Sequence, residues 1–452
     1  MVRAITVVAL FFASLYAKEP FLQEHILLYL NEKNPFYYNA IGKEAVRHAQ
    51  ERFYEGAFDT QFSIKYDEKK YPVSEGTFKQ IALSKPIENG IEFSLAYRNA
   101  QGVQEYNNIK TSTEGEILSS IKIPLVSVIH NISKNQVDLE RAKLTTQETH
   151  QQSRSNLLTL YLQISKAYYQ LLFQKEVLKT EEELLHKAKI NFDFISKEVA
   201  VGKLPKIALL EIQSQIIDRK QRRLNAYNAF LQAKNIFLQY LGVSSQEFDR
   251  LYDLPNLPRK MIDTISLKEA QKIAVANRPE FQRIGYEIEK VTLQQKYNHL
   301  SKYPKLDLKL YGVYDLKYKE GYKVSVDFKF PLERRRYKGQ DEALRKQILL
   351  LHSSKSKLLK EITTKIQNLL QKIDMKKEAI KLSHEELVLV EKLEKVENRK
   401  YQEGMSHLML INQREIKTLQ TKQKLLRYYY DLKLLEMALN YELGRYHNQR
   451  HL

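Results

Sequence analysis

The chain has 452 residues, of which 73 are Lys or Arg and 54 are Asp or Glu, giving a formal net charge of +19. It contains no cysteine, which excludes disulfide frameworks, thiolate metal sites, catalytic thiols and a lipid tether on an amino-terminal cysteine. The basic balance raises the question of nucleic acid, but the lysines stand among glutamates along predicted helical faces, so we expect solvated surfaces and no nucleic-acid partner.

The first residues have the pattern of a secretory signal peptide. Arg3 is followed by an apolar run from Ala4 to Leu15, and Ala17 precedes a polar Lys18. We predict a signal peptide over residues 1–17 and a short N-terminal segment over 18–33. Beyond residue 17 no stretch of about 18 uncharged apolar residues occurs, so we expect no helical membrane anchor and predict that any membrane crossing is made by a β-barrel.

Two copies of one plan follow in the chain. Asn34-Pro35 opens a helical segment that leads to a strand at Phe62, and Arg278-Pro279 opens another that leads to a strand at Leu306, and the strand residue lies 27 positions after the proline in both. Each copy then has a strand that ends in Pro-Leu, a long helical stretch, a glycine, a second helical stretch and a terminal Leu-Gly.

The glycines of the two copies keep the same spacing. Gly202 and Gly242 are 40 residues apart, as are Gly404 and Gly444. We therefore predict an internal duplication with repeats at 34–242 and 277–444, an inter-repeat linker and short helix at 243–276, and a tail at 445–452. In the linker, Ser266 and Glu269 form a capping-box pattern that starts a helix.

The helical stretches are unusually long. No glycine or proline occurs in the 77 residues between Pro124 and Gly202, or in the 64 between Gly339 and Gly404. At 1.5 Å per residue they could reach roughly 100 Å. Apolar residues step by four and three, as in coiled coils, with some polar residues in the seam. Such a seam suits helices packed around water, although for any single residue the core of a solvated hairpin is the better explanation.

The strands of the second copy alternate clearly. Tyr322, Val324, Val326, Phe328 and Phe330 are separated by polar residues, which gives one apolar and one polar face. Their length of roughly nine to eleven residues suits a tilted membrane strand. Tyrosines near the strand ends occupy the place of an interfacial girdle.

The first copy has corresponding strands, starting at Phe62 and Ile117, with extra material between them. The turn signal Ile87–Gly90 and the alternation that follows it predict an additional hairpin or an elaborated external loop. Counting two strands per copy gives four per chain, too few to close around a lumen, so we expect a barrel assembled from several chains.

These elements predict an α+β membrane protein, mainly α, with an internal two-fold repeat. Long antiparallel α-helical hairpins form a coiled-coil tunnel, and transmembrane β-strands form an oligomeric β-barrel.

Four motifs occur in order: Asn-Arg-Pro-Glu at 277–280, Tyr-Pro-Lys-Leu at 303–306, Phe-Pro-Leu at 330–332 and Tyr-x-x-Gly at 401–404. With the repeat plan, they make the chain resemble the TolC-like outer-membrane efflux proteins from about Asn34 to Gly444. The resemblance implies a homotrimer whose twelve strands form one barrel in the outer membrane of a Gram-negative bacterium, surrounded by lipid. It also implies a helical tunnel that extends into the periplasm and docks with a periplasmic adaptor (membrane fusion) protein and an inner-membrane pump.

The same resemblance implies roles for residues near the two hairpin tips. The tip residues expected to contact the adaptor are Val201, Gly202, Lys203, Gly404 and Met405. Family members carry pore-ring carboxylates six and nine residues after the second tip glycine, where this chain has Leu410 and Gln413. In the first copy these positions are Ala208 and Glu211. Glu211 is therefore a possible pore-ring carboxylate, and a solvated helical glutamate is the alternative.

Motifs for catalysis are missing from the sequence. No zinc-protease motif, phosphate loop, nucleophile elbow or dinucleotide fingerprint occurs. We therefore expect no enzyme activity, no cofactor and no metal. The predicted function is the exit duct of a tripartite efflux or type I secretion system that exports solutes passively. The alternative is a periplasmic coiled-coil adaptor or envelope scaffold.

Overall fold

The computed structural model describes residues 18–72, 74–102, 111–263 and 265–445. The predicted signal peptide and most of the predicted tail lie outside the described residues. The chain divides into two compact units, and each gathers segments from both predicted repeats. We call them the hairpin unit (residues up to Ile41, Arg154–Arg278 and residues from Leu359) and the sheet unit (Gly42–Ser153 and Pro279–Leu358). The predicted repeat boundaries stay a prediction.

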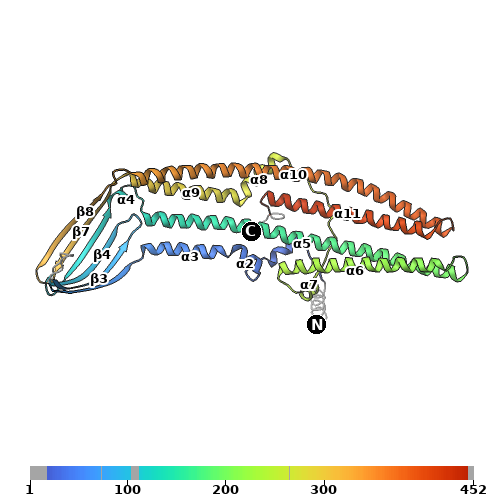
Figure 1. The fold of residues 1–452 in the computed structure, drawn as a ribbon, viewed down its shortest axis with the longest axis horizontal. Coiled ribbons are helices and arrows are strands. Elements are labelled where there is room, and N and C mark those ends of the chain that lie inside the picture. The colour runs from blue at the N-terminus through green and yellow to red at the C-terminus, as the bar shows by residue number, and fades with distance from the viewer. Residues whose placement is uncertain (1–17, 73, 103–110, 264, 446–452) are drawn as a thin grey trace, which may run out of the picture. The chain divides into compact units, whose positions relative to one another are not determined.

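The sheet unit combines one antiparallel sheet with helices (Figure 1). Its elements are α3 (Lys43–Glu55), η2 (Gly56–Phe58), β2 (Gln61–Tyr71), β3 (Ser74–Pro86), β4 (Glu92–Gly102), β5 (Glu116–Pro124), α4 (Leu125–Ile129), α9 (Pro279–His299), η3 (Leu300–Lys302), β7 (Lys305–Asp315) and β8 (Lys319–Lys329). The first parts of α5 (Lys134–Ala200) and α10 (Arg335–Gln402) also belong to this unit.

The described sheet has six strands in the order β2-β3-β4-β5-β7-β8, and every neighbouring pair is antiparallel. The predicted count of four strands per chain is therefore wrong. The extra material of the first copy forms β3 and β4, which lie between β2 and β5 and extend the same sheet. A hairpin was one of the two predicted alternatives for this segment, and the sheet contains it.

The turn between β3 and β4 follows from its sequence. Gly90 has φ +88°, a conformation that costs glycine little because it has no Cβ. The Ile87 N–H donates to the Ile91 carbonyl at 2.8 Å, and the Asn89 side chain accepts from the Ile91 N–H at 3.1 Å. These bonds close the turn and fix the register of the two strands.

The long helices of the predicted hairpins are confirmed, with 67 residues in α5, 68 in α10 and 35 each in α6 (Ile207–Leu241) and α11 (Leu408–Glu442). One detail differs: the first long helix does not run directly from Pro124. Asn131 has φ +47°, which interrupts it after α4, and the Ser133 hydroxyl then accepts from the Gln136 N–H to start α5. None of the helices in the described ranges has both the length and the apolar composition needed to cross a membrane.

The hairpin unit also contains short elements around the ends of the helices. They are β1 (Glu19–Pro20) paired in parallel with β6 (Tyr252–Asp253), η1 (Gln23–Tyr29), α2 (Pro35–Ile41), α7 (Ser245–Leu251) and α8 (Leu267–Asn277). The Ser266 hydroxyl accepts from the Glu269 N–H at 3.3 Å and caps α8. The predicted helix start at this serine is thereby confirmed.

An aromatic core holds the N-terminal described segment onto α5 and α6. Phe21 is completely buried, with its ring against those of Tyr168, Phe237 and Phe248. The Tyr168 hydroxyl donates to the Phe21 carbonyl at 2.6 Å, and burial raises the pKa of this hydroxyl. This unit therefore contains its own apolar core.

Candidate functional site

The six-stranded sheet carries one continuous apolar face. Residues paired across antiparallel strands point to the same side of a sheet. The registers align large apolar side chains in rows that cross several strands: Phe62, Leu83 and Leu95; Ile64, Ile81, Tyr97, Ile117 and Tyr314; Phe93, Ile121, Leu310 and Val324. Many of these are exposed, including Leu95 at 53% and Val324 at 55%. Such a large exposed apolar face requires a partner or a lipid surface.

The opposite face is mostly polar, with one apolar row formed by Ala82, Ala96, Leu118 and Val313. The residues that alternate with the apolar rows include Ser84, Ser94 and Ser120, which are aligned by the registers. Ion pairs join neighbouring strands on this face, among them Arg98 with Glu116 and Lys309 with Asp327. A sheet with one apolar and one polar face can separate an apolar medium from water.

Both edges of the sheet are open. Within the described residues, β2 pairs only with β3 and β8 pairs only with β7. An open edge leaves a row of backbone N–H and C=O groups without partners, which is costly in an apolar medium. Because the sheet has an even number of antiparallel strands, β2 and β8 run in opposite directions. The β8 edge of one copy can therefore pair antiparallel with the β2 edge of another.

The two hairpin tips have the same backbone geometry. Gly202 and Gly404 have φ +77° and +76°, and the following N–H groups, those of Lys203 and Met405, donate to carbonyls five residues earlier at 2.9 and 2.8 Å. This is the glycine-based termination that ends a helix by satisfying its last carbonyls. The predicted glycine positions are thus where the chain turns from α5 to α6 and from α10 to α11.

The tip side chains point into solvent. Val201 is 66% exposed and Met405 is 68% exposed. The Lys203 ammonium lies 3.4 Å from the Glu198 carboxylate. Both tips thus combine an exposed apolar side chain with nearby charges, a composition suited to contact with another protein. The structure places all five predicted tip residues in these two turns.

The predicted pore-ring positions are less distinctive. Glu211 and Gln413 are exposed, on α6 and α11, and Leu410 is 40% exposed. An exposed glutamate on a helix fits both interpretations of Glu211.

A buried ion pair joins the α5–α6 hairpin to the α10–α11 hairpin, farther from the tips than Glu211 and Gln413. It was not predicted from the sequence. Arg219 of α6 donates to the Glu415 carboxylate of α11 at 2.8 Å, and both side chains are 3% exposed. Arg219 also donates to the Leu184 carbonyl and to Asn412, while Asn191 donates to Glu415. The only signal in the sequence for the burial of Arg219 was that it lies seven residues after Ile212, which is also buried. The network holds α5, α6 and α11 together.

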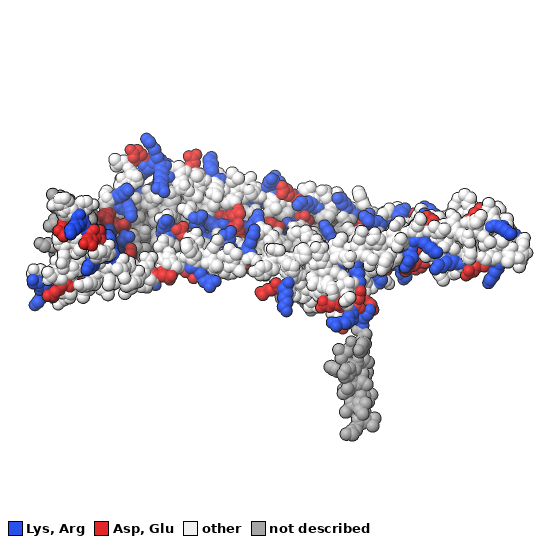
Figure 2. Space-filling model, turned by 60° about the horizontal axis from the view of Figure 1, so that its bottom comes forward, with Lys and Arg blue, Asp and Glu red and all other residues white. Residues whose placement is uncertain are grey.

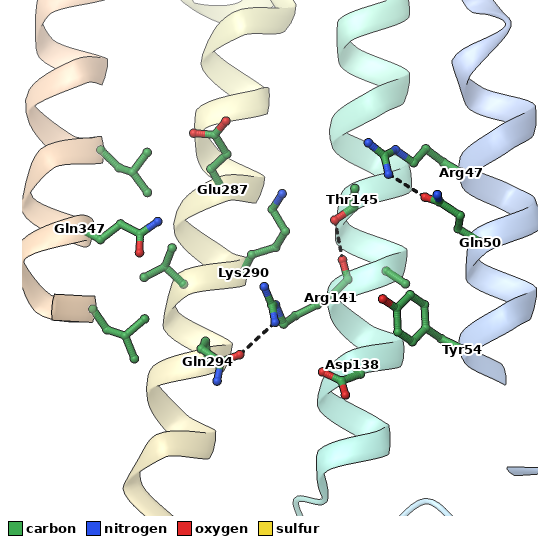
Figure 3. Close-up of a pocket in the computed structure, with 14 residues that line it drawn as sticks. Arg47, Gln50, Tyr54, Asp138, Arg141, Thr145, Glu287, Lys290, Gln294 and Gln347 are labelled. Carbon is green, nitrogen blue, oxygen red and sulfur yellow. Dashed lines mark hydrogen bonds between the residues drawn. The ribbon is translucent and has the colours of Figure 1, made fainter. Parts of the chain in front are cut away.

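A polar cavity of about 530 Å³ lies in the sheet unit among α3, α5, α9 and α10 (Figure 3). Figure 3 shows Arg47 bonded to Gln50 and Arg141 bonded to Gln294. At its wall, burial raises the pKa of the Glu287 carboxyl, and the nearby Glu148 raises it further. The arginines are thus already bonded to amide side chains, and the cavity offers no concentrated charge of one sign.

Charges of both signs are mixed over the face seen in Figure 2. No concentrated basic patch comparable to a nucleic-acid surface is visible on that face. In the part of the chain that the structure describes, no group of three or more His, Asp or Glu side chains could hold a metal ion.

Comparison with known proteins gives one family and a set of similar structures. The model of the outer membrane efflux protein family matches residues 92–243. The outer membrane protein VceC of Vibrio cholerae is 13% identical, with a TM-score of 0.69 over 94% of this chain and 96% of that chain. The outer membrane channel CmeC of Campylobacter jejuni is 12% identical, with a TM-score of 0.67 over 93% and 85%.

A membrane protein from Pseudomonas aeruginosa is 10% identical, with a TM-score of 0.71 over 95% of this chain and 92% of that chain. No curated protein matches the sequence. The matched segment runs from β4 to the turn after α6. It contains β4 of the β3–β4 hairpin, then β5, and the whole helical hairpin of α5 and α6. The chain therefore resembles the TolC-like outer membrane efflux proteins in sequence over residues 92–243, and it has their fold over nearly its whole length.

Proposed function

We propose that this protein is the outer-membrane exit duct of a tripartite efflux or type I secretion system in a Gram-negative bacterium. The observation that carries the proposal is the six-stranded sheet, with a continuous exposed apolar face, a mostly polar opposite face and two open edges. Such a sheet suits lipid on one side and a water-filled lumen on the other. Conduction through a lined pore is passive and needs no catalysis, cofactor or metal.

The open edges support a closed ring of copies. Pairing β8 of one copy with β2 of the next satisfies the edge groups and keeps every neighbour antiparallel. In the homotrimer that the family resemblance implies, six strands per chain give eighteen strands. This replaces the twelve strands that the resemblance implies, and it lies within the range of known bacterial barrels.

The exposed tips support docking to other proteins. We assign Val201, Gly202, Lys203, Gly404 and Met405 to contact with a periplasmic adaptor, which connects the duct to an inner-membrane pump. Their exposure and the matched turn geometry favour this role. Glu211 remains a candidate for a pore ring. The pump selects the exported substrate, so the duct itself has no need of a binding pocket for it.

The test is fractionation followed by measurements on the purified protein. We expect the processed protein in the outer-membrane fraction, a mass of three copies in mild detergent that dissociates on heating, and ion conductance in planar bilayers. A protein that stays soluble in periplasmic extract without detergent would overturn the proposal and favour the adaptor or scaffold alternative. A monomer without conductance would also overturn it.

A further inference from the structure

A cavity of about 920 Å³ lies at the end of the sheet where the strands join the helices. The register brings the end of β5 at Pro124, the start of β7 at Lys305 and the end of β8 at Lys329 to this one end. Residues of α9, η3 and the start of α10 complete its wall. Figure 1 shows β7 and β8 meeting α9 and α10 there. We call this site the basic cavity.

Positive charge dominates the lining of the basic cavity. Cationic side chains outnumber acidic ones in its wall, with Lys305, Lys329, Arg334, Arg335 and Arg336 against Asp307 and Glu333. The Lys305 ammonium lies 3.2 Å from the Asp307 carboxylate, so these two charges offset each other. Lys329 and the three arginines are exposed, and none of them forms an ion pair with another described residue. The cavity therefore has unpaired positive charge and favours an anionic ligand.

The basic cavity also borders the apolar face of the sheet. Leu306 lines the cavity, and the register pairs Leu306 with Phe328, which is exposed on that face. Phe330 lines it as well, and the Arg334 guanidinium lies 4.8 Å from the centre of the Phe330 ring. Leu332, between this ring and the arginines, is 82% exposed. Exposed apolar groups next to cations fit the boundary between the acyl chains and the phosphates of a membrane.

We propose that the basic cavity binds an anionic phospholipid of the membrane leaflet on the helix side of the sheet. Arg335 and Arg336 bind the phosphate, and Leu332 lies among the acyl chains. A guanidinium suits this role because it forms paired hydrogen bonds to phosphate oxygens. The excess of cations selects a phospholipid with a net negative charge over a zwitterionic one. The inference rests on the proposed function, because it needs lipid against the apolar face.

The next copy of the chain offers a different anionic partner. β8 is an open edge, and the acidic Glu55 and Asp59 stand just before β2, the opposite edge of the sheet. Carboxylates from a neighbouring copy could therefore approach the arginines. They would leave the exposed Leu332 without an apolar partner, whereas a phospholipid covers both the charges and this side chain. The lipid is the partner that the surface fits better, and the test separates the two.

The test counts the phospholipids bound to the purified oligomer in a neutral detergent by native mass spectrometry. The probes are phosphatidylglycerol, which has a net negative charge, zwitterionic phosphatidylcholine, and inorganic phosphate. The double variant Arg335→Gln/Arg336→Gln removes two cations from the cavity. The matched control Lys317→Gln/Lys319→Gln removes two lysines at the other end of the same β7–β8 hairpin. All four side chains are exposed, so both variants should fold.

We expect the unmodified oligomer to retain phosphatidylglycerol in preference to phosphatidylcholine. A Lys or Arg close to an anionic lipid contributes about fivefold to binding, so the arginine variant should need roughly 25-fold more phosphatidylglycerol for the same occupancy. The lysine control should bind the lipid as the unmodified protein does. Added salt should weaken the binding, and inorganic phosphate should not displace the lipid.

Four results would overturn the proposal. Equal retention of the two phospholipids would show no selection by charge, and equal weakening in the two variants would show no role for the position of the arginines. Displacement by inorganic phosphate at the concentration of the lipid would indicate a site for a free anion. Dissociation of the arginine variant in neutral detergent would show that the arginines contact the next copy instead.

The mass and conductance of the unmodified protein separate this inference from the proposed function. A conducting trimer that shows no preference for phosphatidylglycerol overturns only the lipid site. A monomer without conductance overturns both.

Discussion

The sheet unit and the hairpin unit place their large apolar side chains differently. Among the described strand residues, the buried apolar side chains are those of Phe78, Ala82, Ala96 and Ala100. Most of the Ile, Leu, Tyr and Phe side chains on the apolar face of the sheet are exposed. In the hairpin unit, Ile164, Leu171 and Phe237 are completely buried in an aromatic and aliphatic core. The hairpin unit thus draws stability from its own interior, whereas the sheet requires an apolar medium outside the chain.

This difference sorts the expected effects of substitutions. A change in the hairpin unit should act on folding in any solvent, because its contacts lie within the chain. A change on the apolar face of the sheet should act only when the sheet enters lipid. The following experiments break or sharpen that contrast, starting with the largest effect.

The largest effect is expected from Arg219→Met in the hairpin unit. The variant leaves the Glu415 carboxylate buried without its cation, and breaking a buried pair in this way costs about 3–5 kcal/mol. Urea unfolding monitored by helical circular dichroism measures the loss. Arg222→Met is the matched control on the same helix, because the Arg222–Asp218 pair is exposed and contributes only about 0.3–0.5 kcal/mol.

The double variant Arg219→Met/Glu415→Leu sharpens this result. Removing both charges leaves no unpaired carboxylate, so we expect the double variant to be more stable than Arg219→Met alone. If Arg219→Met and Arg222→Met lost the same free energy of unfolding, burial of the Arg219–Glu415 pair would not make it more important for stability than the exposed pair.

The next effect is expected in the sheet from Leu95→Arg. Leu95 lies on the exposed apolar face, and an arginine on the lipid side of a membrane strand costs about 2–4 kcal/mol near the middle of the bilayer. The neighbouring Ser94 faces the polar side, so Ser94→Arg should assemble nearly as well as the parent protein. The measurement is the fraction of heat-sensitive oligomer formed on refolding into lipid vesicles. If Ser94→Arg lost more oligomer than Leu95→Arg, the assignment of the two faces would be reversed.

A third effect concerns glycine in two backbone conformations. Gly404→Ala in the hairpin tip should lose about 1–2 kcal/mol, because φ +76° is unfavourable for a residue with a Cβ. Gly339→Ala, in the part of α10 that belongs to the sheet unit, should gain about 0.5 kcal/mol, since this glycine is helical and an added Cβ meets no atom within 4 Å. Thermal unfolding of the two variants therefore shifts in opposite directions. Shifts of the same sign would show that one of the two backbone assignments is wrong.

The sequence predicts the two units unevenly. The hairpins could be located because long stretches without Gly or Pro end at Gly202 and Gly404, and breakers of this kind act locally. The strands of the second copy could be located because alternation is also a local pattern. Which strands pair is not local, so the same alternation left the segment before Ile117 open between a hairpin and an external loop. The count of strands per chain was wrong for this reason.

Polar contacts between residues far apart in the sequence could not be predicted either. Arg219 and Glu415 are 196 residues apart, and a charged side chain in a helical stretch is usually exposed. Only the three-dimensional packing of α6 against α11 shows that this arginine is buried. The tip turns of the candidate site could therefore be predicted from sequence, whereas the buried network that joins α5, α6 and α11 could not.

The smallest effects are expected from two carboxyls whose pKa values are shifted in opposite directions. In the sheet unit, burial and the nearby Glu148 raise the pKa of Glu287. Below the ordinary pKa of a glutamate, Glu287 is protonated in both the folded and the unfolded protein and does not lower the stability of the fold. As the pH rises through the raised pKa of the folded protein, the ionised carboxylate increasingly destabilises the fold. Glu287→Gln should therefore stabilise the protein at pH 7 and have little effect at pH 4.

In the hairpin unit, burial acts to raise the pKa of Glu394, but hydrogen bonds from Lys187 at 2.5 Å and from Thr418 outweigh it and lower the pKa. The stability that this carboxylate contributes is present above its ordinary pKa and is lost as the pH falls through the lowered folded pKa. Glu394→Gln should therefore destabilise the protein at pH 7 and have less effect as the pH falls. Melting temperatures of the two variants at both pH values measure this contrast. If both variants shifted the melting temperature in the same direction at pH 7, the surroundings of one carboxyl would be misassigned. The variant whose shift is opposite to its prediction identifies that carboxyl.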